Sequence, residues 1–511
     1  MSDPTLVHHL IERHAAAAPD QEFVIHSERC GSYGDVDREA NRTARVLQSQ
    51  GLSPGDRVGL LSRNSLLFVE SFYGILKAGG VAVLLNTASK GAALSRLLED
   101  CGASGLIVGA GSGSQARQAM TEDLRLDWVL EEPGQAKGEF REGQPHLDLL
   151  EARATHSSQA LDLALDETSL AAIIYTSGST GESKGVMLTH RNLLSNTRSI
   201  VSYLDLQAND RVLSVLPFFY VYGLSLLNTH AYCGGSLVIE NQTLYPNVML
   251  DTLESEGCTG FSGVPSNFAI LLNRSTFVER EMAQLRYVTQ AGGSMGPDLT
   301  RRLMAALPGR EIFIMYGATE ASARLAYLPP SMLREKIGSI GRAIPEVDLR
   351  LITADGREAE TGEVGEIIAS GPNIMVGYWN DRVATDEVLD GLGYHTGDLA
   401  YRDDDGFFFI VGRKRDFIKA GAHRVSAKEI EEAILSLGDS HEVAVIGVPD
   451  ETMGERIRAF VVPLDGRELE ERAIIKALRA ILSPHKVPSE VHFRDGLPKS
   501  EAGKVLKGDL R

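Results

Sequence analysis

Short apolar runs alternate with amphipathic stretches through the first part of the chain. Residues 57–61, 81–85 and 105–108 are apolar runs, and residues 66–77 and 94–99 carry apolar positions at helical spacing. Continuous apolar strands that alternate with amphipathic helices are typical of a parallel sheet covered on both faces. We therefore expect a doubly wound α/β sheet in this region.

The same alternation returns between residues 211 and 316. Apolar runs at 211–217, 236–240, 287–291 and 312–315 are interleaved with helical patterns at 248–256 and 297–307. This repetition predicts a second wound sheet. The Gly/Ser/Gln stretch at residues 109–115 is predicted to be a surface loop.

The pattern changes after residue 348. Residues 348–370 alternate between apolar and polar positions and contain the turn pairs Asp355-Gly356 and Thr361-Gly362, which favours antiparallel strands of a small barrel-like subdomain. Beyond the basic cluster at 413–415, residues 427–437 show helical spacing and residues 442–448 read as a strand. We expect a large N-terminal domain over residues 1–414 and a smaller, mobile α+β domain over residues 415–511.

Composition narrows the class of protein. A chain of 511 residues exceeds one ordinary hydrophobic core, and its 43% hydrophobic and 23% charged content is that of a globular protein. A net charge of -18 disfavours nucleic acid and anionic membranes as partners. Four dispersed cysteines without a C-x-x-C pair, no basic and apolar leader, and no apolar run of about 18 residues predict a cytoplasmic protein without a membrane span.

The segment from Thr176 to Gly185 is the strongest candidate for chemistry. Its glycines allow backbone N–H groups to approach anionic oxygens, its hydroxyls add donors or a metal ligand, and Lys184 adds a positive charge for a polyphosphate. A Walker A loop needs G-x-x-x-x-G-K-[ST], whereas Gly178 to Lys184 is G-x-x-G-x-x-K. A P-loop NTPase is therefore disfavoured, and composition alone leaves a flexible surface loop as the alternative.

This loop and four further blocks resemble, in the same order, the signatures of the adenylate-forming superfamily. That superfamily contains acyl-CoA synthetases, adenylation domains of peptide synthetases and luciferases. The four blocks are Tyr316-Gly317-Ala318-Thr319-Glu320, Tyr394-His395-Thr396-Gly397-Asp398, Gly412-Arg413-Lys414-Arg415-Asp416 and Leu497-Pro498-Lys499-Ser500-Glu501-Ala502-Gly503-Lys504. One block is weak support, but five in order extend the resemblance over essentially the whole chain. It is closest to stand-alone AMP-dependent acyl-CoA ligases.

The resemblance implies ATP-dependent activation of a carboxylic acid as an acyl-adenylate, followed by transfer of the acyl group. Lys504 corresponds to the catalytic lysine of adenylation, Arg415 to the hinge about which the small domain rotates, and Lys419 to a lysine near the site in the second state. Without the resemblance, Lys504 would be interpreted as an ordinary exposed lysine.

The resemblance also implies sites for ATP and Mg2+. Thr176 and Glu320 would hold the metal, because magnesium prefers a few hard oxygen ligands. Asp398 and Arg413 would contact the ribose, and Tyr316 offers a flat face for adenine. Without the resemblance, Glu320 reads as a capping residue and Asp398 as a turn residue. The full expected nucleotide site is Thr176, Ser177, Gly178, Ser179, Thr180, Gly181, Lys184, Gly292, Gly293, Tyr316, Gly317, Thr319, Glu320, Asp398 and Arg413.

The run from Leu216 to Gly223 is similar to the segment that lines the acyl pocket in the superfamily. Peptide-synthetase domains usually place an aspartate there, whereas this chain has aromatic residues, so an α-amino acid is disfavoured. Tyr220 stands where acyl-CoA synthetases often carry histidine. We expect an apolar or aromatic acid in a pocket formed by Phe219, Tyr220, Gly223 and Gly292, although aromatic residues in such a run are also common in cores.

The acceptor is the least determined part of the prediction. CoA is expected as the co-substrate, with an acceptor channel at Gly421, Ala422 and Arg424, yet Ala422 stands where many CoA-using relatives have glycine. Two alternatives stay open: transfer to an amine or to a separate carrier-protein thiol, and a nucleotide-binding pseudoenzyme. The joint presence of Lys504, Glu320, Thr176 and Asp398 disfavours the pseudoenzyme. The acid, the pathway and the oligomeric state do not follow from the sequence.

Overall fold

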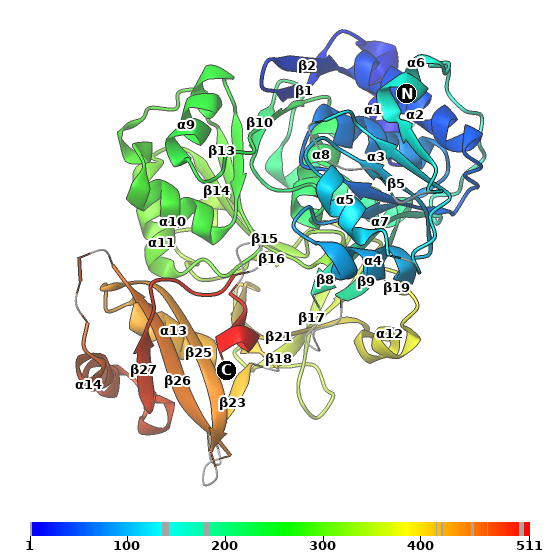
Figure 1. The fold of residues 1–511 in the computed structure, drawn as a ribbon. Coiled ribbons are helices and arrows are strands. Elements are labelled where there is room, and N and C mark those ends of the chain that lie inside the picture. The colour runs from blue at the N-terminus through cyan, green and yellow to red at the C-terminus, as the bar shows by residue number, and fades with distance from the viewer. Residues whose placement is uncertain are drawn as a thin grey trace.

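The computed structural model describes residues 3–121, 123–134, 140, 143–177, 183–414, 416–420, 423–450, 454–464, 466–467, 469–499 and 505–510. Within these residues the chain forms two large mixed sheets and two smaller ones (Figure 1). The large sheets lie side by side in the upper part of Figure 1, and the smaller sheets lie below them. The expected α/β fold class is confirmed.

The first large sheet has the strand order β19-β9-β8-β4-β3-β5-β6-β7. Strands β3 to β8 are parallel, as expected, whereas β9 and β19 add an antiparallel edge. The strands are β3 (Arg57–Leu61), β4 (Val81–Leu84), β5 (Ala103–Val108), β6 (Trp128–Glu131), β7 (His146–Asp148), β8 (Leu170–Ser177), β9 (Ser183–Thr189) and β19 (Gly377–Tyr378).

Helices of this part of the chain include α3 (Leu66–Lys77), which has the predicted bounds, and α4 (Gly91–Asp100), α5 (Gly113–Ala119) and α6 (Leu149–Ala154). The surface loop expected over residues 109–115 is wrong in its second half, because α5 begins at Gly113. Small residues at Gly113, Ala116 and Ala119 are buried along one face of α5. The Gly/Ser/Gln composition hides this spacing.

The second large sheet has the order β16-β15-β14-β13-β12-β10-β11-β1-β2. It is parallel from β14 to β1, with antiparallel strands at both edges. The strands are β1 (Glu22–His26), β2 (Arg29–Ser32), β10 (Arg211–Ser214), β11 (Ser236–Ile239), β12 (Gly260–Gly263), β13 (Tyr287–Gln290), β14 (Glu311–Tyr316), β15 (Ala326–Leu328) and β16 (Arg342–Ala343). The N-terminal hairpin β1–β2 was not expected in this sheet.

The helices around this sheet begin at recognisable caps. Ser32 and Asp35 form a capping box at α2 (Tyr33–Ser49), and Thr189 and Asn192 form another at α7 (His190–Leu204). Helix α8 (Val221–Cys233) is buried on all sides from Val221 to Ala231, so it belongs to the core that joins the two sheets. The remaining helices are α1 (His9–Ala17), α9 (Pro246–Ser255), α10 (Pro265–Arg274) and α11 (Pro297–Ala306).

The two smaller sheets follow the predicted change of pattern. The first is antiparallel and contains β17 (Asp348–Ile352), β18 (Gly365–Ser370), β20 (Leu389–Asp390), β21 (Gly393–Arg402) and β22 (Phe408–Arg413), with α12 (Arg382–Val388) before β20. The second contains β23 (Phe417–Ala420), β24 (His423–Ser426), β25 (Ser440–Asp450), β26 (Gly454–Pro463) and β27 (Glu490–Phe493), with helices α13 (Ala427–Leu435) and α14 (Glu471–Ile481). The domain boundary at residues 414 and 415 stays a prediction.

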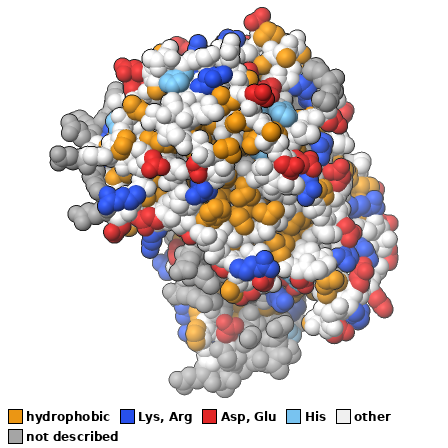
Figure 2. Space-filling model, turned by 90° about the vertical axis from the view of Figure 1, so that its right-hand side faces the viewer, with side chains coloured by type: hydrophobic (Ala, Val, Ile, Leu, Met, Phe, Trp, Pro, Cys, Tyr) orange, Lys and Arg blue, Asp and Glu red, His pale blue; other side chains and the backbone are white. Residues whose placement is uncertain are grey.

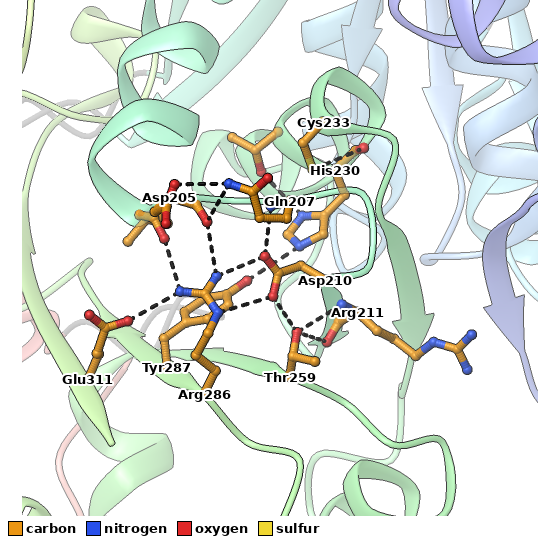
Figure 3. A network of polar contacts seen from close by, with 12 residues as sticks. Asp205, Gln207, Asp210, Arg211, His230, Cys233, Thr259, Arg286, Tyr287 and Glu311 are labelled. Atoms are coloured by element: carbon orange, nitrogen blue, oxygen red, sulfur yellow. Dashed lines mark hydrogen bonds and ion pairs between the residues drawn. The ribbon is translucent and has the colours of Figure 1, made fainter. Parts of the chain in front are cut away.

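A polar network joins the amino ends of β10, β13 and β14 (Figure 3). The Arg286 guanidinium contacts Asp210 at 2.8 Å and Glu311 at 3.2 Å. Asp210 also accepts hydrogen bonds from the Thr259 hydroxyl and the Gln207 backbone N–H. Burial opposes the charge of Asp210, but these donors lower its pKa below the usual range.

The surface carries charges of both signs. On the face shown in Figure 2, acidic and basic side chains are interspersed around hydrophobic side chains near the centre. In the part of the chain that the structure describes, no helix is long and apolar enough to cross a membrane.

Candidate active site

Tyr316, at the carboxyl end of β14, is joined to the predicted ribose block. Its hydroxyl donates to one carboxylate oxygen of Asp398 at 2.6 Å, and Arg413 Nε donates to the other at 2.9 Å. Asp398 is only 5% exposed. Burial, followed by the charge of Asp398, raises the pKa of Tyr316 well above its usual value. The fold therefore brings together three residues that the sequence placed in separate blocks.

Thr176 and Lys184 are partners across the β8–β9 ladder. The Lys184 ammonium lies 5.0 Å from the centre of the Tyr378 ring, and the Tyr378 hydroxyl donates to Glu320 Oε1 at 2.9 Å. Glu320 lies in a 3-10 turn, η2 (Thr319–Ala321), directly after β14. The predicted phosphate lysine and the predicted metal ligand are thus connected through one aromatic side chain, and burial together with Glu320 raises the pKa of Tyr378.

Tyr394 connects these two groups of residues. It is 5% exposed on β21. Burial raises its pKa most, and the nearby Glu320, Tyr378, Tyr316 and Asp398 raise it further. Three of the predicted nucleotide residues, Tyr316, Glu320 and Asp398, therefore lie near this buried phenol.

Glycines let the backbone fold closely at this site. A Cβ at Gly317 would lie 1.8 Å from the Ala323 carbonyl oxygen, and Gly292 has a φ of +81°. The Gln290 amide donates to the Gly293 carbonyl at 2.8 Å, while its buried Oε1 has no hydrogen-bond partner among the described residues. The end of β13 thus presents a buried acceptor beside the two glycines.

The predicted acyl segment lies at the entry to α8. Phe219 is buried and Tyr220 half-buried, with their rings 4.6 Å apart, and Asn86 approaches the Tyr220 hydroxyl at 3.5 Å. Since Asn86 follows β4, this contact joins the two large sheets. A Cβ at Gly223 would lie 2.2 Å from the Pro217 carbonyl oxygen, so close packing of the segment on itself requires this glycine.

Several predicted residues lie outside the described part of the chain. These are Gly178, Ser179, Thr180, Gly181, Arg415, Gly421, Ala422 and Lys504. For Ser177, Lys419 and Arg424 the structure describes the backbone alone, and Lys419 and Arg424 are ladder partners in β23 and β24. Their roles stay predictions.

Tyr378 and Arg324 were missed by sequence reasoning. Tyr378 belongs to a two-residue strand that reaches β9 from far along the chain, and no local pattern marks it. Arg324 had a usable signal, since it is the single charge in the run Ala321-Ser322-Ala323-Arg324-Leu325-Ala326. A lone charge in an apolar segment is costly to bury and points to a special role.

The fold and the joined residue blocks are those of a nucleotide-dependent ligase. The AMP-binding enzyme family matches residues 11–379, and the AMP-binding enzyme C-terminal domain matches residues 429–504. The chain therefore belongs to the AMP-binding enzyme family and is an enzyme of its AMP-forming acid–CoA ligase group.

Known proteins are similar to this chain over nearly its whole length. The chain is 34% identical to a feruloyl-CoA synthase from an Amycolatopsis species, over 98% of this chain and 97% of the relative. It is 31% identical to a long-chain-fatty-acid–CoA ligase from Salmonella typhimurium, over 98% and 93%. A crystal structure of ATP-bound MatB from Rhodopseudomonas palustris superposes with a TM-score of 0.88 at 29% identity, over 99% of this chain and 98% of that one.

Proposed function

We propose that this enzyme uses ATP to adenylate an apolar or aromatic carboxylic acid and then transfers the acyl group to the thiol of CoA. The observation that carries the proposal is that the fold joins Tyr316 and Arg413 to Asp398, and Tyr378 to Glu320. The names of the similar proteins, which are CoA ligases of an aromatic and a fatty acid, support the acid class and the acceptor.

The residues present fit a nucleotide with its metal. Asp398 keeps lone pairs free on both oxygens for ribose hydroxyls, because Tyr316 and Arg413 occupy one position on each. Glu320 and Thr176 supply the hard oxygens that Mg2+ prefers, and Tyr378 fixes the orientation of Glu320. Bound Mg2+ would neutralise phosphate charge. Burial opposes the charge of Arg413, but Asp398, Tyr316 and Asp416 together raise its pKa, so it keeps its charge.

In the first step, an oxygen of the substrate carboxylate attacks the α-phosphorus of ATP. The bond to the bridging oxygen breaks, pyrophosphate leaves, and a mixed anhydride of the acid and AMP remains. Lys184 and the glycine loop would hold the phosphates, and Lys504 would bring the carboxylate to the phosphorus. The protein acts here by positioning and by charge stabilisation.

In the second step, the sulfur of CoA attacks the acyl carbon, the bond to AMP breaks, and the thiol proton passes to solvent. We assign residues 1–414 and 415–511 to two domains that rotate about Arg415 between the steps. Rotation would withdraw Lys504, bring Lys419 toward the site, and place Gly421, Ala422 and Arg424 along the acceptor channel.

The first experiment is acid-dependent exchange of labelled pyrophosphate into ATP, with alkanoic, aryl and α-amino acids. We expect exchange with an apolar or aromatic acid and none with α-amino acids. Product masses from the best acid, offered with CoA, an amine or a carrier protein, identify the acceptor. An amide without a thioester would contradict CoA as the acceptor, and silence with every acid would contradict the proposed activity.

The assignment of Lys504 has its own test. Lys504→Ala should abolish pyrophosphate exchange and leave thioester formation from a supplied acyl-adenylate largely intact. Equal loss of both half-reactions would contradict the proposed rotation. The neighbouring Lys499→Ala is the matched control, because Lys499 forms an ion pair with Glu442 and has no proposed catalytic role.

A further inference from the structure

Arg324 is a buried cation without an acidic partner. Its side chain is 2% exposed, and no carboxylate of the described residues lies within ion-pair distance of it. The other buried cations in the described chain are paired: Lys77 contacts Asp37 at 2.8 Å as well as Glu12, and Arg153 contacts Glu70. Arginine stays protonated in a protein, so burial cannot be relieved by loss of a proton.

The surroundings of Arg324 only partly compensate its charge. The guanidinium carbon lies 4.0 Å from the centre of the Tyr222 ring, Nε donates to Met315 Sδ at 3.3 Å, and Nη1 donates to the Ala323 carbonyl at 3.2 Å. The Tyr203 hydroxyl also lies beside the guanidinium, which opposes the burial that raises the pKa of Tyr203. A ring face, a thioether, one carbonyl and a neutral hydroxyl satisfy a guanidinium much less well than a bidentate carboxylate. The site therefore favours binding of an anion.

The backbone holds Arg324 in place at a cost. The two residues before it, Ser322 and Ala323, have φ values of 55° and 123°, which are unfavourable for residues other than glycine. Asn196 exchanges two hydrogen bonds with the Arg324 backbone, and Asn373 donates a third to its carbonyl. Strain that neighbouring residues maintain in this way is typical of functional positions.

The Arg324 side chain lies between the predicted acyl segment, Leu216–Gly223, and the predicted nucleotide segment, Tyr316–Glu320. Tyr222 belongs to the acyl segment, and its hydroxyl is fixed at 2.9 Å from Thr289 Oγ1 on β13. Met315 directly precedes Tyr316, and Arg324 follows Glu320 by four residues. The guanidinium thus lies where β13, β14 and α8 meet.

We propose that Arg324 is the specificity-determining residue of the acyl pocket and that it binds a second anionic group of the acid substrate. The inference rests on the proposed function, and it narrows the substrate to a dianionic acid with an apolar or aromatic body. The activated carboxylate is not the partner, because adenylation removes its charge and would leave Arg324 unpaired again. A second carboxylate keeps its charge through both steps.

The test compares matched acids in the pyrophosphate exchange assay. The pairs are hexanoate with adipate, octanoate with suberate, and phenylacetate with its para-carboxylated form. We expect kcat/KM for the dianionic member of the best pair to be higher by on the order of 10²-fold or more, because a pocket built for a polar group rejects analogues that lack it. The dianionic acid alone should also raise the Tm of the free enzyme.

Arg324→Met and Arg324→Lys separate recognition from packing. Arg324→Met should lower kcat/KM for the dianionic acid to about that of its monocarboxylate partner and abolish the Tm increase. The unliganded Tm should be equal or higher, because replacing a buried charge that lacks an acidic partner by an apolar side chain is not destabilising. Arg324→Lys should keep a reduced preference, since lysine retains the charge and loses the planar fork.

Three outcomes would overturn the inference. Equal kcat/KM for the two acids of every pair in the wild-type enzyme would refute the role of Arg324, but it would not contradict the proposed activity. An equal loss of activity on both members of each pair in Arg324→Met, with a lower Tm, would make Arg324 a packing residue. Absence of exchange with every acid would refute the proposed function itself, and the inference with it.

Discussion

The two ends of the nine-stranded sheet satisfy their polar side chains to different extents. At the amino ends of the strands, Asp210 and Arg286 contact each other and additional partners (Figure 3). At the carboxyl ends, the buried Ser214 Oγ and Gln290 Oε1 have no hydrogen-bond partner among the described residues, and Arg324 has no acidic partner among them. Both ends belong to the same sheet, so the difference lies in what each end is used for.

Buried polar groups that lack partners cost stability, typically about 1–3 kcal/mol each. In an α/β sheet, ligands bind beyond the carboxyl ends of the strands. We therefore infer that the amino ends of the strands stabilise the fold, whereas the carboxyl ends keep polar groups available for a ligand. The following variants test these two roles, beginning with the largest expected effect.

Glu320→Ala should lower the pyrophosphate exchange rate by on the order of 10²–10³-fold, because the site loses the proposed charged metal ligand and the acceptor of the Tyr378 hydroxyl. The rate should be measured over a series of Mg2+ concentrations. Glu335→Ala, at an exposed position away from the site, is the control. Normal exchange in Glu320→Ala would exclude the proposed metal site.

Arg286→Met should lower the free energy of unfolding by about 3 kcal/mol, because it leaves the carboxylate of Asp210 buried without its cation. Urea unfolding measures the loss, and pyrophosphate exchange at 25 °C should be unchanged. Arg280→Met is the matched control, since its partners Asp251 and Glu254 are exposed and the pair should contribute less than about 1 kcal/mol. Equal effects of the two variants would contradict a stabilising role for this network.

His230, beside the same network, predicts a pH dependence. Burial lowers its pKa to about 4, whereas the pKa of the same side chain in the unfolded chain is about 6.5. Between these values the unfolded state binds more protons, so stability falls as the pH falls, by about 2 kcal/mol between pH 7 and pH 5. His230→Phe should remove that part of the loss in urea unfolding at the two pH values. An unchanged pH dependence would mean that His230 has the same pKa in the folded and the unfolded protein.

Tyr316→Phe should raise the KM for ATP about tenfold, because Asp398 loses a hydrogen bond that holds it for the ribose. The Tm should change little. Tyr401→Phe, on β21 like Asp398, is the control, since the Tyr401 ring stacks on Phe409 and should tolerate the loss of its hydroxyl. Equal KM values in the two variants would contradict the proposed role of the Tyr316–Asp398 contact.

Most of the large parallel strands could be predicted from the sequence. Strands such as Arg57–Leu61 and Tyr287–Gln290 are mostly apolar and buried at nearly every position, because both faces of the sheet are covered, and α3 has clear apolar spacing. Two of the five residue blocks contain Tyr316, Glu320 and Asp398, which the fold brings near one another, and their roles stay predictions. Local patterns were sufficient for these strands and this helix, but they missed β6 and β12, which are also buried at every position.

Contacts between distant segments could not be predicted in this way. Strand β19 pairs with β9 across about 190 residues of sequence, which places Tyr378 on Lys184, and β1–β2 joins a sheet whose other strands begin at residue 211. The absence of an acidic partner for Arg324 among the described residues is likewise a property of the packed structure, because an isolated sequence does not show which carboxylates lie nearby.

The most direct test of these two roles compares two variants. Asp398→Asn changes a residue beside the carboxyl end of β14, and Asp210→Asn changes a residue at the amino end of β10. For each, acid-dependent pyrophosphate exchange and the Tm are determined in the same preparation. We predict that Asp398→Asn loses exchange by on the order of 10²-fold, whereas Asp210→Asn keeps exchange. Both variants should lower the Tm by several degrees, because each removes the anion of a buried ion pair. Loss of exchange at unchanged Tm in Asp210→Asn, or normal exchange in Asp398→Asn, would contradict the account.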